Sequence, residues 1–167
     1  MDREAAVTEQ REASKDAVMT RIGQAIMLLH GGDREEARNR FGELWSEIGE
    51  DGDALHRCTL AHYMADTQDD PGDELAWDLR ALTAAGSLTD ERAAQHSDAL
   101  AVRAFYPSLH LNLAADYVKL HRPEAARIHL DRARAASGVL ADDGADDGYG
   151  GGVRAAIARL ELRLREL

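Results

Sequence analysis

Apolar side chains recur every three or four positions along most of this chain of 167 residues, and that spacing places them on one face of an α-helix. The first series contains Val18, Ile22 and Ile26, and it ends at the glycines Gly31 and Gly32, where a left-handed helix cap favours glycine. Further helices are expected to begin near residues 33, 55, 71, 87, 107, 123 and 153. Only two Phe, two Trp and four Tyr are present, while Ala, Leu, Glu and Arg dominate. The sequence therefore predicts an all-α protein.

The same pattern divides the chain into four segments of a single domain. Residues 1–17 are highly charged and predict a solvated helical extension. Residues 18–140 supply the helices of the core, and residues 141–152, ADDGADDGYGGG, predict an acidic, glycine-rich loop that should be mobile. Residues 153–167 predict a last amphipathic helix, which would cap the domain or form a seam with a second copy of the chain.

The clearest helix pair covers residues 107–138. Ala114 and Tyr117 share a face of its first helix, Pro123 fits the first turn of its second helix, and Ala126, Leu130 and Ala133 follow at helical spacing.

These positions resemble a tetratricopeptide repeat, a helix pair of 34 residues with a small residue, an aromatic residue and an apolar triplet at fixed offsets. The unit lacks the Trp near its start, and Gly138 stands where the repeat closes on Pro. A similar triplet occurs near residue 41, but the repeat spacing stretches in the middle of the chain. The resemblance implies antiparallel helix pairs, about seven helices in all, stacked as a short right-handed superhelix or as a compact helical domain.

The resemblance also implies a concave binding surface, formed by the first helix of each pair. The family positions transfer to these residues of the present chain: Ile22, Ile26, His30, Cys58, His62, Asp66, Leu111, Val118 and Lys119. Most of this face is apolar, so we expect it to be filled. The chain's own first or last helix could fill it, and so could an amphipathic helix from a partner protein.

Two groups of side chains invite a chemical interpretation. Cys58 and His62 lie four residues apart on one helix face, which permits a metal or thiol site, but no second spaced ligand pair accompanies them. Arg103, Tyr106 and His110 combine a cation, an aromatic ring and an imidazole, which could hold an anionic ligand, although core packing explains the ring equally well. We predict no catalytic residue, no metal and no cofactor.

The formal net charge of −11 argues against nucleic acid as a partner, because phosphate binding needs a basic surface. The single cysteine excludes an internal disulfide, no apolar run approaches the length of a membrane span, and the N-terminus has no apolar signal core. These features predict a soluble, cytoplasmic protein. Arg far outnumbers Lys, with only Lys15 and Lys119, which is typical of bacterial genomes of high GC content.

We therefore expect a non-enzymatic protein–protein interaction or scaffold module that buries an apolar helical segment in its groove. One alternative is a helical sensor or enzyme that binds a small molecule or a metal through Cys58, His62, Arg103 and His110. Another is a self-associating structural protein, a homodimer whose groove is filled by a second copy of the chain.

Overall fold

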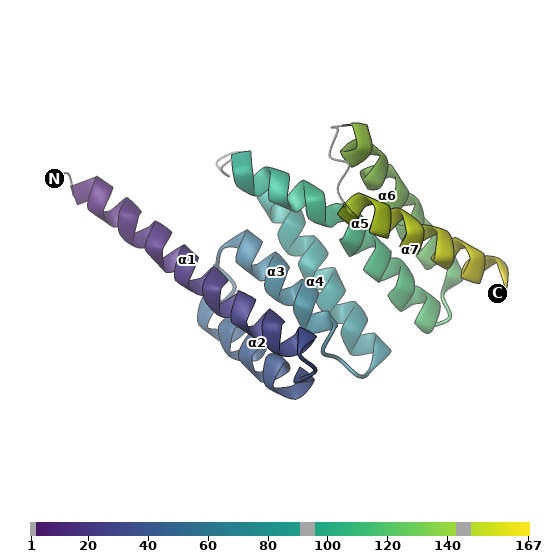
Figure 1. Cartoon of the computed structure of the whole chain (residues 1–167), viewed down its shortest axis with the longest axis horizontal. Helices are drawn as coiled ribbons and strands as arrows, with labels where there is room; N and C mark the ends of the chain where they lie inside the picture. Colours follow the sequence, from purple (N-terminus) through teal and green to yellow (C-terminus); the bar gives the residue numbers. More distant parts are fainter. Residues whose placement is uncertain (1–2, 91–95, 143–147) are drawn as a thin grey trace.

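The computed structural model of this chain describes residues 3–90, 96–142 and 148–167. Within these ranges the secondary structure consists of seven α-helices and no strand, which confirms the predicted all-α class. The helices are α1 (Arg3–His30), α2 (Arg34–Ile48), α3 (Ala54–Ala65), α4 (Pro71–Asp90), α5 (His96–Lys119), α6 (Pro123–Asp142) and α7 (Gly148–Arg165). They follow one another across the molecule, from α1 and α2 at one end to α6 and α7 at the other (Figure 1).

The helices pack in two layers. Each helix contacts the next one in the chain, and α1, α3, α5 and α7 also contact one another in succession. Among the described residues the even-numbered helices contact only odd-numbered ones. The odd-numbered helices therefore form a continuous layer, which the even-numbered helices cover on one side.

The turn between α1 and α2 follows from its glycines. Gly32 adopts a φ of 92°, which L side chains rarely adopt, and its N–H donates to the carbonyl of Leu29 at 3.1 Å. The N–H of Asp33 donates to the carbonyl of Leu28 at 2.9 Å. Together these bonds satisfy the last carbonyls of α1 in a Schellman motif, as the glycine pair predicts.

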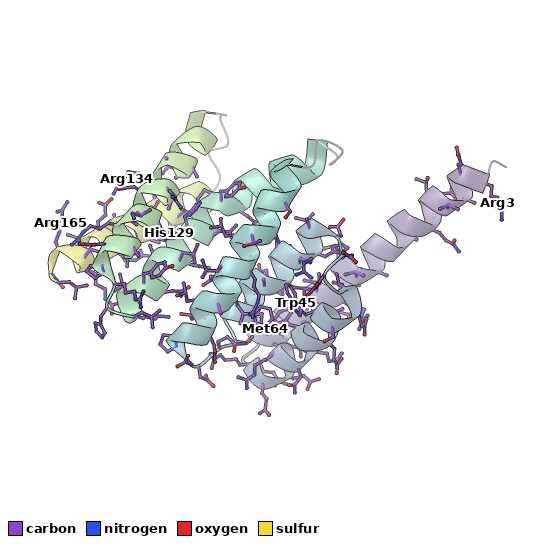
Figure 2. The ribbon with its side chains drawn as sticks, turned by 180° about the vertical axis from the view of Figure 1, so that it is seen from behind. Arg3, Trp45, Met64, His129, Arg134 and Arg165 are labelled. Carbon is purple, nitrogen blue, oxygen red and sulfur yellow. The ribbon has the colours of Figure 1, made fainter. Side chains whose placement is uncertain are left out.

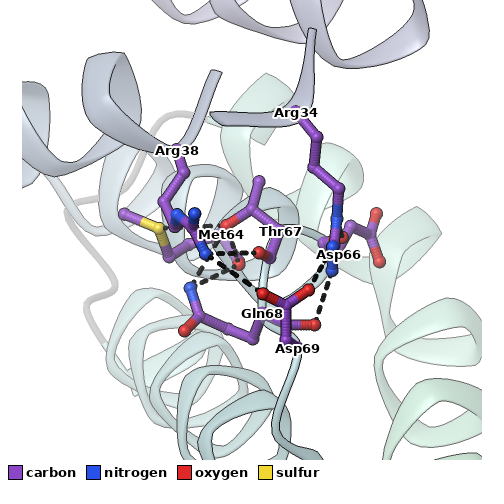
Figure 3. Close-up of polar contacts among 7 residues, drawn as sticks. All are labelled: Arg34, Arg38, Met64, Asp66, Thr67, Gln68 and Asp69. Carbon is purple, nitrogen blue, oxygen red and sulfur yellow. Dashed lines mark hydrogen bonds and ion pairs between the residues drawn. The ribbon is translucent and has the colours of Figure 1, made fainter. Parts of the chain in front are cut away.

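Two arginines of α2 donate hydrogen bonds to the turn between α3 and α4 (Figure 3). Arg34 donates to the carbonyl of Gln68 at 2.6 Å and to that of Asp66 at 3.3 Å, and Arg38 donates to the carbonyl of Thr67 at 3.3 Å. Both guanidinium groups also pair with Asp69. Carbonyl groups that have no partner inside α3 are thus satisfied by charged donors, which fixes α2 against the end of α3.

Small side chains bring α3, α4 and α5 close together. Ala61, Ala81 and Ala85 are fully buried between these helices, beside Cys58 and Leu109. A second cluster, around the fully buried Phe41, joins α1, α2 and α3. A third joins α5, α6 and α7 around Ala126, Leu130, Val153, Ile157 and Leu164. Burying one Leu, Ile or Phe side chain contributes roughly 1.5–3 kcal/mol, so these clusters stabilise the helix packing.

The helix boundaries differ from the sequence prediction in the middle of the chain. We expected one helix over 87–104 and a new helix from Pro107. Instead, residues 87–90 belong to α4, and α5 runs from His96 to Lys119 with Pro107 inside it. Pro107 is fully buried, and so are Leu109 and Leu113, which follow it in α5. Phe105 and Tyr106, which precede it, pack against the core cluster that contains Leu109. Packing before and after Pro107 outweighs the one hydrogen bond that a proline removes from a helix.

The helical extension predicted over residues 1–17 is continuous with the first core helix. α1 is one helix of 28 residues that crosses the predicted boundary at residue 17, and its N-terminal half projects from the body of the molecule (Figure 1). Part of the loop expected over 141–152 is helical instead, because α6 continues to Asp142 and α7 starts at Gly148. Residues 143–147 of that loop lie outside the described residues. None of the helices, over the described ranges, is both long and apolar enough to cross a membrane.

Candidate functional site

The apolar residues expected to line a groove lie inside the protein. Ile22, Cys58 and Val118 have exposed fractions of 1%, 0% and 4%, and each belongs to one of the three core clusters. Ile26 and Leu111 are half-buried at the margins of the same clusters. Val118 is covered by the chain's own last helices, since it packs in one cluster with residues of α6 and α7. Ile22, Cys58 and Val118 therefore stabilise the fold and do not line an open groove, whereas Ile26 and Leu111 keep part of their surface exposed.

The polar residues from the same prediction meet at one end of the odd-numbered helices. His30 is the last residue of α1, Asp66 follows α3, and Lys119 is the last residue of α5. His30 and Lys119 both act electrostatically on the Asp66 carboxyl. Three helices from distant parts of the chain therefore end side by side, which means that they run in the same direction.

α4 adds carboxylates to this end of the molecule. The ammonium group of Lys119 donates to Glu74 Oε1 at 2.6 Å, and Glu74 is only 17% exposed. Partial loss of solvent raises the pKa of Asp66, and the negative charge of Glu74 raises it further. His30, Lys119 and Arg34 oppose that increase without cancelling it.

Two further aspartates face each other between α4 and α5. Asp78 is 1% exposed and Asp116 is 2% exposed. Oδ1 of Asp78 and Oδ2 of Asp116 are buried without a hydrogen-bond partner among the described residues. We call Asp66, Glu74, Asp78 and Asp116 the carboxyl cluster. Two ionised carboxylates in such a place would repel each other and lack donors, so the pair must hold a proton.

The protonation of this pair follows from its surroundings. Burial raises the pKa of Asp78 to about 7, although a hydrogen bond with Asp116 lowers it. Burial also raises the pKa of Asp116, and the carboxylates of Asp78 and Glu74 raise it further. The pair therefore keeps a proton at neutral pH, shared between the two carboxyl groups. Two carboxyl groups that share one proton form a stable buried contact.

Three members of this cluster, Glu74, Asp78 and Asp116, were not predicted from the sequence. A signal for two of them exists in the sequence. Asp78 lies one turn after Leu75 and one turn before Leu82, and Asp116 lies between Ala114 and Tyr117. A charged residue on the apolar face of a predicted helix is unusual and indicates a buried polar contact.

Cys58 and His62 do not form a reactive pair. Burial raises the pKa of the Cys58 thiol to about 12 and lowers the pKa of His62 to about 4. Both side chains are therefore neutral at pH 7, and a neutral thiol is a poor nucleophile and a poor metal ligand. Nδ1 of His62 lies 3.4 Å from Nδ2 of Asn112, and its ring stands edge-on to Phe105 at 5.8 Å between centroids. His62 thus packs α3 against α5.

Tyr106 and His110 belong to a stack of four rings. The order is Tyr106, His110, His129 and Tyr117, with centroids 6.0, 5.4 and 5.5 Å apart. Nδ1 of His110 lies 3.1 Å from Nδ1 of His129, so one imidazole donates and the other accepts. Burial lowers the pKa of His110 to about 4, which keeps it neutral. The stack joins α5 to α6, and the side chain of Arg103 lies outside the described residues.

Across the described ranges, no group of three or more His, Cys, Asp or Glu side chains is arranged to hold a metal ion. The carboxyl cluster thus offers a negative surface, with a proton inside it, at the shared end of three helices. No protein-family model, no curated protein and no solved structure matches this chain, so the resemblance to tetratricopeptide repeats stays a prediction.

Proposed function

We propose that this protein is a non-enzymatic protein–protein interaction module that binds a basic segment of its partner at the carboxyl cluster. The observation that carries the proposal is the convergence of three helix C-termini on the carboxylates of Asp66 and Glu74. The C-terminal end of a helix carries a partial negative charge, which adds to the charge of these side chains. Such a surface attracts Lys and Arg side chains.

The turn between α3 and α4 extends the negative surface. Asp69, Asp70 and Asp73 follow Asp66 within eight positions, and all four residues are exposed. Arg34 and Arg38 form ion pairs with Asp69, and Arg34 also acts electrostatically on Asp66. Asp70 and Asp73 remain available to a partner, apart from the Asp70 carboxylate that accepts the N–H of Asp73 at 3.1 Å.

An amphipathic basic helix fits this surface better than an all-polar segment. Ile26 and Leu111 lie half-buried on the odd-numbered helices whose ends form the site. A partner helix could lay an apolar side chain beside them and direct its basic side chains to the cluster. The continuous layer of odd-numbered helices supports this proposal, because helical repeat proteins bind their partners on such layers.

A cytoplasmic location belongs to the same proposal. The one cysteine is a buried thiol, which suits a reducing compartment.

The experiment is a binding titration with a designed helical peptide of Leu and Lys, labelled with a fluorophore. The control peptide carries Glu in place of Lys. We expect the Lys peptide to bind at low salt and to weaken as salt is added, and the Glu peptide not to bind.

Variants locate the interaction. The triple substitution Asp66→Asn, Asp70→Asn and Asp73→Asn should weaken binding of the Lys peptide about tenfold, because three rim charges are removed. A control triple, Glu4→Gln, Glu9→Gln and Glu50→Gln, changes the net charge equally at exposed positions outside the site. Equal affinity of the two triple variants would show that net charge alone attracts the peptide, and would overturn the proposed site.

A further inference from the structure

A cleft lined by arginines, in contrast to the acidic carboxyl cluster, lies between α6 and α7, at the end of the molecule away from the projecting half of α1. Arg134 and Arg165 mark it in Figure 2, far from Arg3. The cleft has a volume of about 270 Å³, and its floor includes Leu130 and Leu164. Both leucines are buried in the core cluster that joins α5, α6 and α7.

Three arginines and two acidic residues line the walls of this cleft. Arg134 pairs with both acids, with Asp131 at 2.9 Å and with Glu161 from α7. One guanidinium group thus uses both carboxylates of the cleft. Within the described part of the chain, neither Arg127 nor Arg165 forms an ion pair.

Helix geometry offers the two acidic residues more than one partner, since Asp131 lies three residues before Arg134 and also four residues after Arg127. Arg127 and Asp131 lie four residues apart on α6, and Glu161 and Arg165 lie four residues apart on α7. Residues at this spacing are neighbours on a helix surface, so each free arginine has an acidic residue within reach. Asp131 and Glu161 instead both form ion pairs with Arg134. The result is a cleft with two uncompensated cations, from two helices, above an apolar floor.

We infer that this cleft binds a small carboxylate that carries an apolar group. The guanidinium groups of Arg127 and Arg165 would hold the carboxylate, and Leu130 and Leu164 would contact the apolar group. A guanidinium group presents parallel N–H donors that match the two oxygens of a carboxylate. The volume lies just below the usual range of small-molecule pockets, roughly 300–1,000 Å³, so the ligand is small.

The charge of this part of the chain is compatible with an anionic ligand. The whole chain carries a formal net charge of −11, which repels anions in general. Residues 120–167, which include α6 and α7, contain eight arginines and eight acidic residues, so this range is formally neutral and the excess negative charge lies in the rest of the chain. The cleft is independent of the carboxyl cluster, so this inference does not rest on the function proposed above.

The experiment is a titration of the full-length protein with hexanoate at neutral pH, followed by the backbone amide resonances of α6 and α7. Hexanol supplies the apolar group without the charge, and inorganic phosphate supplies a charge without the apolar group. We expect saturable shifts with hexanoate, and binding at least about tenfold weaker with either of the other two probes.

Four single variants test the residues. Arg127→Gln and Arg165→Gln should each weaken hexanoate binding about tenfold, because each removes a charged hydrogen-bond donor. Arg132→Gln and Arg163→Gln are matched controls on the same two helices, outside the cleft lining, and should leave the affinity unchanged. All four side chains are exposed, so the variants should fold. Equal affinity in all four variants, equal binding of hexanol or phosphate, or no saturable binding of hexanoate would each overturn the inference.

Discussion

At the scale of single residues, the buried pair Asp78 and Asp116 is the feature that most restricts how this fold responds to pH. Neither carboxyl group has a basic partner of its own, because the nearby Lys119 pairs with Glu74. Other charged groups around the pair are Asp66 from the end of α3 and Glu74 from α4, which are both acidic. The pair therefore depends on a bound proton to avoid repulsion between two buried negative charges.

The first prediction concerns this proton. An unfolded aspartate ionises near pH 4, whereas the pKa of Asp78 is raised to about 7 and that of Asp116 is also raised. Between pH 4 and 7 the folded protein binds more protons than the unfolded chain, so the free energy of unfolding from this pair falls as pH rises. Asp116→Asn keeps a neutral donor beside Asp78 and removes one titrating group. We expect the variant to match the wild type near pH 4.5 and to be more stable by about 1–3 kcal/mol at pH 7.5.

Urea denaturation across this pH range measures the difference. Asp69→Asn is the matched control, since the pKa of Asp69 is lowered by its hydrogen bond with Arg34. A lowered pKa gives the opposite sign, so this control should be less stable than the wild type at neutral pH and equal to it at low pH. A stability difference for Asp116→Asn that does not change with pH would contradict the shared proton.

The second prediction concerns Cys58. Its thiol is fully buried, and burial raises its pKa to about 12. Alkylation requires a thiolate that solvent can reach, so the native protein should react with iodoacetamide more than about a hundredfold slower than the unfolded chain. Mass spectrometry at timed intervals measures both rates. Native labelling as fast as unfolded labelling would show that Cys58 is accessible, and would restore a thiol chemistry for this site.

At the scale of helices, local sequence signals predicted where most helices begin but not where several of them end. Pro71 and Pro123 begin helices as their type indicates, whereas Asp33 precedes α2 without forming the side-chain cap that its type predicts. Pro107 was interpreted by the same rule, but packing on both sides of it keeps α5 continuous. Gly138 is the last residue of the predicted helix pair, yet α6 continues for four more residues. A single proline or glycine costs a few kcal/mol at most, which tertiary packing can outweigh.

The third prediction tests the end of α6. Gly138 is exposed in the helix interior, and a Cβ added there meets nothing within 4 Å. Gly138→Ala should therefore stabilise the protein by about 0.5–1 kcal/mol, because alanine loses less backbone entropy in a helix. Gly32→Ala is the contrasting variant and should destabilise it, since Gly32 has a φ of 92°. Thermal unfolding of the two variants gives both values. A loss of stability in Gly138→Ala would indicate that α6 ends earlier.

The candidate site shows the limit of prediction from local patterns. His30, Asp66 and Lys119 were predicted only as members of a larger binding surface, at equivalent positions of the repeat resemblance, and the structure brings these three together. Asp78 and Asp116 could not be paired from the sequence, since they come from helices whose contact is set by the alanines between them. Sequence spacing describes one helix face at a time. A contact between two faces depends on how the helices cross.

At the scale of the whole molecule, charge separates the two proposed sites. The carboxyl cluster lies where α1, α3 and α5 end, and the arginine-lined cleft lies between α6 and α7. α7 covers α5 through Val153, Ile157 and Leu164, so the apolar surface that a repeat array would leave open is closed by the chain itself. Binding at the carboxyl cluster should therefore be mainly electrostatic, with apolar contact limited to half-buried side chains such as Ile26 and Leu111.

The most direct test of this account is an NMR titration of the isotopically labelled protein with the Leu/Lys peptide at low salt. The proposal predicts that amide shifts concentrate in residues 64–75 and 116–121, at the ends of α3 and α5 and the start of α4. The same titration at high salt should abolish them. Shifts spread evenly over the acidic surface, or confined to α6 and α7, would contradict a binding site at the carboxyl cluster.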